Sequence, residues 1–414
     1  MHNLLPIVSL LLSTFLMMAG AGLQGILLPV RASIEGWNAY EIGLMGTSYA
    51  LFFTLGCVVM PAIVRSAGHV RTFSSLAALL AISVLLNGLI LEPVTWILVR
   101  GLAGFALAGA YMVIESWLNE RVTNETRGLV FSIYMVVTMA AMMTGQLAMP
   151  LADPTLASSF MVCAILYALA VIPNALSRAP SPKPLTQVRL DLRSLYRNSP
   201  AAAAGVFLVG ILSGAWTNMA PVLGQEVGLS TGQISLLLVA TMAGGAAFQV
   251  PLGRVSDRID RRVVLALAGA IGVAAAASAL TLWNTDPLGL FAIAFVIGGV
   301  IYPAYSLAVA HANDVADPAD FVKISGGLLI LYGFGTMGGP LLAAWLIETY
   351  GPEGVFLATG GAHLLLLVYT LARLGLRPAP RSLERADFQP VLLPRAQTPG
   401  SSALDPRADA ALDR

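Results

Sequence analysis

Two charged side chains lie inside apolar stretches of the first half of the sequence, and a cluster of charge separates two apolar runs of the second half. The isolated pair is Arg100 and Glu115. Fifteen residues of helix span about 22 Å, so these two side chains cannot pair with each other. The cluster is Gly253–Arg262 (GRVSDRIDRR), with four arginines and two aspartates. Such groups suit ion pairing, anion binding and proton transfer, and the cluster must lie outside hydrocarbon.

Each of these groups has two interpretations on the sequence alone. Arg100 either binds an anion or takes part in proton coupling, or it extends its guanidinium outward to the membrane surface. Glu115 either forms a gating ion pair with Arg65, Arg71 or the charged cluster, or carries a proton from a buried position. The cluster either only fixes the orientation of the chain by its positive charge or makes specific contacts with neighbouring helix ends.

The composition restricts the class of protein. Of 414 residues, 57% are hydrophobic and 11% are charged, whereas soluble domains have about 25% charged residues. The formal net charge of +1 gives no indication of nucleic-acid binding, and the basic residues form loops and no basic domain. Cys57 and Cys163 lie in apolar runs, which predicts core positions and no metal site. Four scattered histidines and no phosphate-binding loop give no basis for a membrane enzyme, an ATPase or a cofactor.

Twelve apolar segments are long enough to cross the hydrocarbon core as helices, which takes about 20 residues each. They lie at residues 6–30, 41–64, 72–91, 94–118, 128–150, 157–177, 201–223, 232–252, 263–283, 287–311, 322–347 and 353–373. These runs are too long for membrane strands and do not alternate with a period of two. The sequence therefore predicts an all-α polytopic membrane protein.

The lysines and arginines predict the orientation of these spans. With the N-terminus inside, 14 basic residues fall in the inner loops and one, Arg31, falls in an outer loop. Acidic residues gather in the outer loops instead. We therefore expect both termini in the cytosol.

The longest connection divides the twelve spans into two groups of six. We expect a first six-helix bundle over 1–177, a cytosolic connection over 178–200, a second bundle over 201–373 and a disordered cytosolic tail over 374–414. The two halves also repeat at an offset of 192 residues, and such repeats are typical of transporters. The matched pairs are Pro29 and Pro221, Glu41 and Gln233, Ile42 and Ile234, and Pro61 and Gly253.

The number of spans, the cytosolic termini and the basic loop after span 8 resemble the major facilitator superfamily. The signature loop of that family is roughly G-x-x-x-D-R-x-G-R-R. It is matched here by Gly253, Asp257, Arg258, Arg261 and Arg262. Asp260 stands where the family has a glycine. In the first half, the corresponding stretch Pro61–Arg71 has a proline in place of the first glycine and Arg65 in place of the aspartate.

Within the superfamily, the chain is most similar to bacterial permeases of the YcaD type. The stretches that carry this similarity are Val113–Ser116 in span 4, Gly145–Leu147 in span 5, the second-half loop, and Ile301–Pro303 in span 10. The resemblance implies two pseudo-symmetric six-helix bundles in a bacterial inner membrane. Arg100 and Gly104 also match the R-x-x-x-G pattern of span 4 in this superfamily.

The resemblance implies a central cavity lined by spans 1, 4, 7 and 10, and a loop that latches the outward-facing state. The expected cavity residues are Gln24, Arg100, Tyr111, Trp216, Asn218, Tyr302 and Tyr305. The expected gating and coupling residues are Glu115, Gly253, Asp257, Arg258, Arg261 and Arg262. In this scheme Asp257 caps a neighbouring helix, while Arg258 and Arg261 bridge to the other half. For the aromatic and amide groups, membrane-interface belts and bridges between helices are the alternative roles.

The predicted function is secondary active transport of a small organic solute by alternating access. Protons are the expected coupling ion because Glu115 is a candidate carrier and no aspartate-rich sodium site is evident. We expect a monomer whose partners are the solute, protons and the bilayer, with no nucleic acid and no cofactor. The alternatives are an efflux antiporter for drugs or metabolites, and a receptor or scaffold that does not transport and binds partners through its tail.

Overall fold

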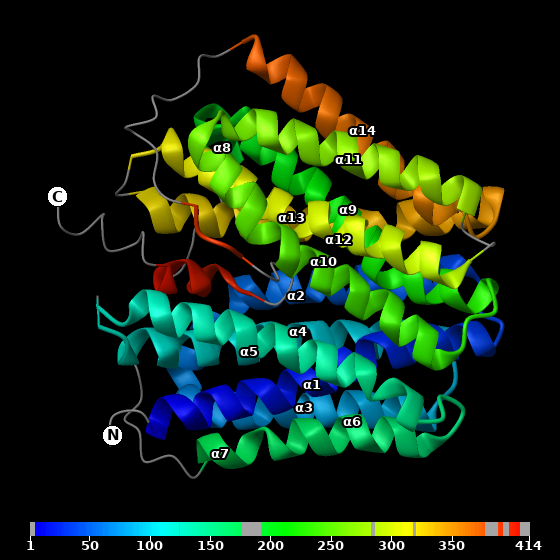
Figure 1. Ribbon diagram of the computed structural model, residues 1–414. Coiled ribbons are helices and arrows are strands. Elements are labelled where there is room, and N and C mark those ends of the chain that lie inside the picture. Colours follow the sequence, from blue (N-terminus) through cyan, green and yellow to red (C-terminus); the bar gives the residue numbers. More distant parts are fainter. Residues whose placement is uncertain are drawn as a thin grey trace.

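The computed structural model describes residues 5–123, 125–175, 192–282, 286–317, 320–376, 388–391 and 397–405. Across these residues, twelve helices are long and apolar enough to cross a membrane. The helices run roughly side by side in two groups of six (Figure 1). The prediction of an all-α protein with twelve spans is therefore confirmed.

The first group forms the N-terminal bundle. Its helices are α1 (Leu5–Ile34), α2 (Ala39–Ala67), α3 (His69–Leu89), α4 (Pro93–Arg121), α5 (Arg127–Leu147), α6 (Ala157–Leu169) and α7 (Val171–Ala175), with the 3-10 turn η1 (Met149–Leu151) after α5. Helices α6 and α7 together form the sixth span.

The second group forms the C-terminal bundle. Its helices are α9 (Pro200–Glu226), α10 (Thr231–Arg258), α11 (Arg261–Leu282), α12 (Pro287–Asp314), α13 (Phe321–Tyr350) and α14 (Gly354–Leu374). A short helix, α8 (Leu192–Asn198), precedes this bundle, and a 3-10 helix, η5 (Pro399–Leu404), follows it.

The repeat at an offset of 192 residues is visible in the way the helices begin. Asn38 and Ser230 are 192 positions apart, and each forms a capping box with the residue three positions later, Glu41 or Gln233. A capping box satisfies backbone N–H groups that the first turn of a helix leaves unpaired. The second span of each half therefore starts with the same local structure.

The helices of each bundle also approach one another at equivalent glycines. A Cβ atom on Gly104 of α4 would overlap the backbone carbonyl of Tyr49 in α2. In the other half, a Cβ atom on Gly298 of α12 would overlap the carbonyl of Thr241 in α10, and Tyr49 and Thr241 are again 192 positions apart. Small residues allow such close helix packing in membranes, where burial of apolar surface gives no drive between helices.

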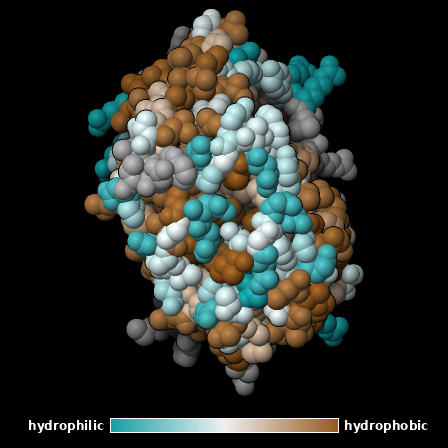
Figure 2. Space-filling view, turned by 90° about the vertical axis from the view of Figure 1, so that its right-hand side faces the viewer, coloured by the Kyte–Doolittle hydropathy of each residue, from teal (hydrophilic) through white to brown (hydrophobic). Residues whose placement is uncertain are grey.

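The two ends of the molecule differ in how the bundles meet. We call the end with the connection between α10 and α11 the loop end, and the opposite end the far end. Toward the far end, α2 and α13 touch directly: the Ala39 N–H donates to Glu348 at 2.7 Å, and the Thr47 hydroxyl donates to the Met337 carbonyl at 2.8 Å. Hydrophilic residues gather over the centre of the far end, with hydrophobic residues toward its margins (Figure 2).

At the loop end, a segment of the C-terminal tail lies between the bundles. Helix η5 contacts α4 and α5 of the first bundle and α13 of the second, and it is drawn in red in Figure 1. Gln397, Thr398, Leu404 and Asp405 are all buried. The tail was expected to be disordered, but these described residues form an ordered segment. The rest of the tail lies outside the described residues.

Candidate functional site

Two adjoining cavities lie between the bundles. The larger encloses about 740 Å³, including the part open to solvent, and the smaller about 670 Å³. The side chains that line both are Tyr49, Arg100, Thr217 and Asn218. Helices α1, α4 and α9 contribute to this lining, as expected for spans 1, 4 and 7. Span 10, which is α12, contributes to neither cavity, and α2 and α13 supply much of the wall instead.

Arg100 is held in the cavity wall by its contact with α2. The centre of its guanidinium lies 4.3 Å from the ring centroid of Tyr49, a distance at which the face of an aromatic ring attracts a cation. Gly104, one turn later in α4, lets the two helices approach closely enough for this contact. The span-4 R-x-x-x-G pattern therefore has a structural reason, because its glycine sets the helix spacing and its arginine faces the cavity.

Two glutamine side chains line the smaller cavity together with Arg100. Gln24 of α1 accepts a hydrogen bond from the Tyr167 hydroxyl at 2.7 Å through its Oε1 atom. Its Nε2 atom and the Oε1 atom of Gln146 in α5 are both buried and have no hydrogen-bond partner among the described residues. An unpaired buried polar group costs free energy. These two amide ends are therefore suited to receive polar groups of a ligand.

Four of the seven predicted cavity residues line these two cavities, namely Gln24, Arg100, Tyr111 and Asn218. The other three do not. Trp216 turns into its own bundle, where its indole N–H donates to the Thr241 hydroxyl at 2.9 Å. Tyr302 packs against Gly245 of α10. Tyr305 lies at a smaller cavity at the loop end, beside Val391 and Gln397 of the tail.

Glu115 is fully buried near the loop end of α4. The Tyr134 hydroxyl donates to its Oε1 atom at 3.3 Å, and the Thr398 backbone N–H donates to the same atom at 3.2 Å. The Thr398 hydroxyl donates to Oε2. Neither partner is basic, so the ion pair with Arg65, Arg71 or the charged cluster is not formed within the described residues. Glu115 instead binds the tail.

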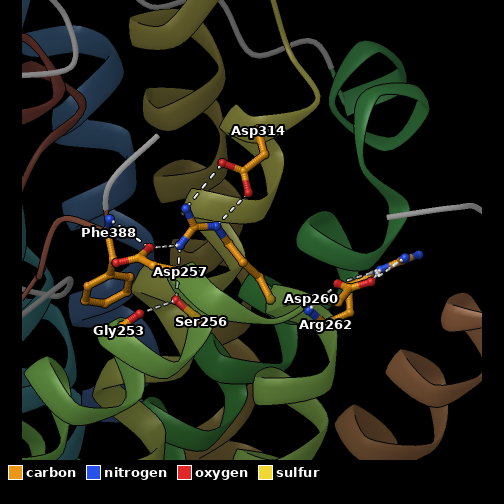
Figure 3. Close-up of polar contacts among 8 residues, drawn as sticks. Gly253, Ser256, Asp257, Asp260, Arg262, Asp314 and Phe388 are labelled. Carbon is orange, nitrogen blue, oxygen red and sulfur yellow. Dashed lines mark hydrogen bonds and ion pairs between the residues drawn. The ribbon is translucent and has the colours of Figure 1, made fainter. Parts of the chain in front are cut away.

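The signature loop is organised around Arg261, whose side chain is buried. Its guanidinium forms an ion pair with Asp314 of α12 at 2.6 Å and another with Asp257 at 3.0 Å, and it also donates to the Ser256 hydroxyl at 3.1 Å (Figure 3). All of these partners belong to the second half, and Arg258 is exposed. Among the described residues, the expected bridge from Arg258 and Arg261 to the first half is therefore absent in this conformation.

Asp257 does not cap a helix as expected. Its Oδ1 atom accepts the backbone N–H of Phe388, in the tail, at 3.1 Å (Figure 3). Gly253 lies beneath the same residue, and a Cβ atom at this position would overlap the Phe388 ring. Gly253 and Asp257, the first glycine and the aspartate of the signature loop, therefore form a docking site for the tail.

Asp260, at the position where the superfamily has a glycine, starts α11. Its Oδ1 atom accepts the backbone N–H of Arg262 at 2.9 Å, as a helix N-cap does, and its carboxylate pairs with the Arg262 side chain at 2.7 Å. Burial alone would raise the pKa of Asp260, but the hydrogen bonds from Arg262 outweigh it and the pKa lies below its usual value. Arg262 also donates to the Arg373 carbonyl at 3.0 Å, which ties α11 to the end of α14.

Twelve spanning helices in two repeated bundles, with a cavity between them, are the architecture of many membrane transporters. The family model of the Major Facilitator Superfamily matches residues 10–219 and 201–404. The chain belongs to this superfamily. It is a multi-pass membrane transporter, and it is not an enzyme.

Individual relatives agree with this assignment. The chain is 24% identical to an uncharacterized MFS-type transporter of Enterobacter sp. (strain 638), over 91% of this chain and 97% of the relative. It is 22% identical to the uncharacterized MFS-type transporter YcaD of Escherichia coli O6:K15:H31 (strain 536 / UPEC), with the same two coverages. The expected similarity to YcaD-type permeases is thus confirmed.

Solved structures share the fold. A mutant of the nucleoside transporter NupG superposes with a TM-score of 0.76 at 14% identity, covering 89% of this chain and all of that one. A bacterial homologue of the human lysosomal transporter Spinster, in an inward-facing and occupied conformation, gives a TM-score of 0.73 at 14% identity, covering 92% of this chain and 97% of that one.

Proposed function

We propose that this chain is a secondary transporter that moves a small organic solute by alternating access through the cavity between its bundles. The observation that carries the proposal is the difference between the two ends. The bundles touch through α2 and α13 toward the far end, whereas at the loop end a separate segment lies between them. A central cavity between two repeats that meet directly at one end fits rigid-body rocking of one repeat against the other.

The proposed orientation places the loop end in the cytosol. The basic loops, including the Gly253–Arg262 cluster, gather at this end, and positive charge favours the cytosolic side. The bacterial relatives support a bacterial inner membrane, with both termini cytosolic. On this assignment the conformation described here is inward-facing. Labelling cysteines placed at Ser66 and Leu91 with an impermeant maleimide in intact cells tests it, because only Leu91 should react.

Alternating access is tested by two pairs of spin labels. One pair, at Ser66 and Lys323, measures the separation of the bundles at the loop end, and the other, at Leu91 and Tyr350, measures it toward the far end. All four side chains are exposed. Any condition that lengthens one distance, such as a change of pH or a bound solute, should shorten the other. Distances that remain single and constant, together with no counterflow of any solute in proteoliposomes, would remove the proposal.

Proton coupling is the proposed energy source, with Glu115 as the carrier. The support is that this carboxyl group is fully buried and that its hydrogen-bond partners among the described residues, Tyr134 and Thr398, are uncharged. Such a group can gain or lose a proton when the bundles move and its surroundings change. In proteoliposomes, an imposed pH gradient should drive uptake by the native chain and not by Glu115→Gln. Uptake that does not depend on the pH gradient, together with full activity of Glu115→Gln, would show that transport is not coupled to protons.

A further inference from the structure

The cavities between the bundles contain a single kind of fixed charge. Among the described residues that line them, Arg100 is the only charged side chain. A cation inside a membrane protein is costly unless an anion or a polar environment compensates it. The ring of Tyr49 provides part of this compensation by attracting the guanidinium. The described lining holds no acidic side chain, so an anionic ligand in these cavities would meet one positive charge and no negative charge.

The amount of charge favours a monoanion. One guanidinium neutralises one negative charge, and its planar fork matches the two oxygens of a carboxylate. A phosphate dianion would carry a second negative charge into a wall that offers no second cation among its described residues. The fork also fits two oxygens of a phosphate, so it is the charge balance that selects the carboxylate.

The rest of the lining describes the body of the ligand. Tyr49, Phe53 and Tyr332 line the larger cavity, so an apolar or aromatic body fits there. The unpaired Nε2 atom of Gln24 and the unpaired Oε1 atom of Gln146 line the smaller cavity. Together they offer a donor group and an acceptor group, and a hydroxyl group can bond to both because it accepts and donates at once.

We propose that the transported solute is a small organic monocarboxylate with an apolar body and a second hydrogen-bonding group, held by Arg100 at its carboxylate and by Gln24 and Gln146 at the second group. This substrate class rests on the proposed transport function, which it makes more specific. The binding measurement below involves no flux, so a failure of the substrate class and a failure of transport are separate results.

A matched series of three probes isolates the charge. The probes are 4-hydroxyphenylacetate, 4-hydroxyphenylacetamide and tyramine, which share a body and a hydroxyl group and carry an anion, a neutral amide and a cation. Affinity for the purified full-length protein is measured by calorimetry at pH 7. We expect the carboxylate to bind about tenfold or more tightly than the amide, as a charge-assisted hydrogen bond gives, and tyramine to bind least.

Substitutions assign the preference to the proposed residues. Arg100→Gln should abolish the preference for the acid over the amide, while Arg100→Lys should retain part of it. Gln146→Leu should weaken 4-hydroxyphenylacetate about tenfold and leave phenylacetate, which lacks the hydroxyl group, nearly unchanged. Equal binding of acid and amide, tighter binding of tyramine, or no binding of any carboxylate across a panel of metabolite acids would overturn the proposal.

A different set of contacts, independent of the cavity charge, concerns the tail. Its described residues join both bundles at the loop end. Toward the second bundle, Phe388 fits over Gly253 and donates its N–H to Asp257 at 3.1 Å, and the Val391 N–H donates to the Ser306 hydroxyl at 3.0 Å. The two hydrogen bonds use backbone N–H groups of the tail, and their acceptors are side chains of the second bundle.

Toward the first bundle, the tail contacts α4 and α5. Gln397 donates to the Met135 sulfur at 2.8 Å, and Thr398 donates two hydrogen bonds to the buried carboxylate of Glu115. Gln397 and Pro399 also form part of the wall of the larger cavity. The segment therefore holds the two bundles at a fixed separation and covers the cavity on this side at the same time.

The geometry points to an intramolecular strap formed by residues 388–391 and 397–405: these residues cover the cavity at the loop end, and they must leave before a solute can pass there or the bundles can meet there. The two ends of the strap bind different sites. One end binds the docking site at Gly253 and Asp257 on the second bundle, and the other binds Glu115 on the first bundle.

Cys57 reports on this closure, because it lines the larger cavity together with Gln397 and Pro399. Replacing the buried Cys163 by alanine leaves Cys57 as the only thiol. In nanodiscs, its rate of reaction with N-ethylmaleimide is compared among the full chain, a chain that ends at residue 387, and a chain that ends at residue 405. We expect the 387 chain to react about tenfold or more faster, as for a site that no longer needs local opening, and the 405 chain to match the full chain.

Two further measurements show whether the strap itself is responsible. A synthetic peptide of residues 388–405, added to the 387 chain, should restore protection, and a peptide of the same composition in reversed order should not. In the full chain, Phe388→Ala with Thr398→Val should react faster than native, while Ser402→Ala should not. Equal rates for the full chain, the 387 chain and the double variant would overturn the proposal.

Discussion

Thr398, in the C-terminal tail, donates both its backbone N–H and its hydroxyl to the carboxylate of Glu115, 283 positions earlier in α4. A charged or polar group buried in a membrane protein needs a partner, and the first bundle supplies only Tyr134 among the described residues. The tail thus completes the hydrogen bonding of a carboxyl group that the helices leave incomplete. This relationship connects a predicted gating residue to a segment that the sequence places outside both bundles.

Replacing Glu115 by glutamine should loosen the tail. The amide oxygen can accept the Thr398 N–H and the amide nitrogen can donate to the Thr398 hydroxyl, so both contacts can persist but neither is any longer a hydrogen bond to a charged group. A bond to a charged group contributes about 1.5–3 kcal/mol, so hydrogen exchange of peptides from 397–405 should be faster by about tenfold or more. Glu120→Gln, on the exposed side of the same helix, is the matched control. Unchanged exchange in Glu115→Gln would contradict this role for the carboxylate.

Substitution of Gly253 should affect the tail only through its contact with Phe388. A Cβ atom at this position would overlap the Phe388 ring, so Gly253→Ala must displace the ring and release the segment that carries it. Hydrogen exchange around residues 388–391 should rise as it does in Phe388→Ala, and the double variant should exchange no faster than either single variant, because both remove one contact. Gly375→Ala, where a Cβ atom meets open space, should have no effect. Additive effects in the double variant would mean that Gly253 has another partner.

The ion pair between Arg261 and Asp314 should dominate the stability of the signature loop. Both side chains are almost fully buried and 2.6 Å apart. Removing one partner leaves an uncompensated buried charge and typically costs about 3–5 kcal/mol. Arg261→Gln and Asp314→Asn should each lower thermal stability in detergent strongly, whereas the double variant should lose clearly less than the sum of the two. Losses that simply add would show that the pair is not coupled.

Much of the fold could be predicted from the sequence because its determinants are local and repeated. Apolar length sets the spans, and the offset of 192 residues brings Glu41 and Gln233 to equivalent capping positions. The role of Asp260 was not predictable from the family pattern. Among the described residues, positive φ angles are confined to glycines, so the turn before α11 does not need the usual glycine and uses an N-cap instead.

The site was harder to predict because it depends on which faces of the helices border the cavity when the two bundles come together in one conformation. Trp216 is polar, aromatic and deep in its span, yet it satisfies its indole N–H within its own bundle. Gln146 was noted only as part of a family motif, although it lines the cavity. The order of the tail is not predictable from its own sequence, because it comes from backbone donors and one ring that contact distant residues. Composition rules for disorder count a segment's own apolar residues and not such partners.

Gly104 should be needed for both packing and binding. A Cβ atom there would overlap the Tyr49 carbonyl, so Gly104→Ala forces α4 away from α2 at a cost of about 1–3 kcal/mol. It should also separate Arg100 from the Tyr49 ring and weaken binding of a carboxylate probe. Gly25→Ala has open space around its Cβ atom and lines the same cavity, so its thermal stability should match the native protein. Equal stability of the two variants would exclude the proposed helix contact.

Asp260 should make the stability of the loop end depend on pH. Its pKa is held below the usual value of 3.8 by Arg262, after the opposing effect of burial. The carboxylate therefore stabilises the folded state above about pH 4, and this contribution is lost as the pH falls through the lowered pKa of the folded state. Asp260→Asn keeps an N-cap residue but loses the charge. The variant should unfold at a lower temperature than the native protein at pH 7, and this difference should shrink between pH 4 and pH 3. Equal unfolding temperatures at every pH would show that Asp260 acts through its cap alone, and a difference that stays constant over this range would show that the charge is not responsible.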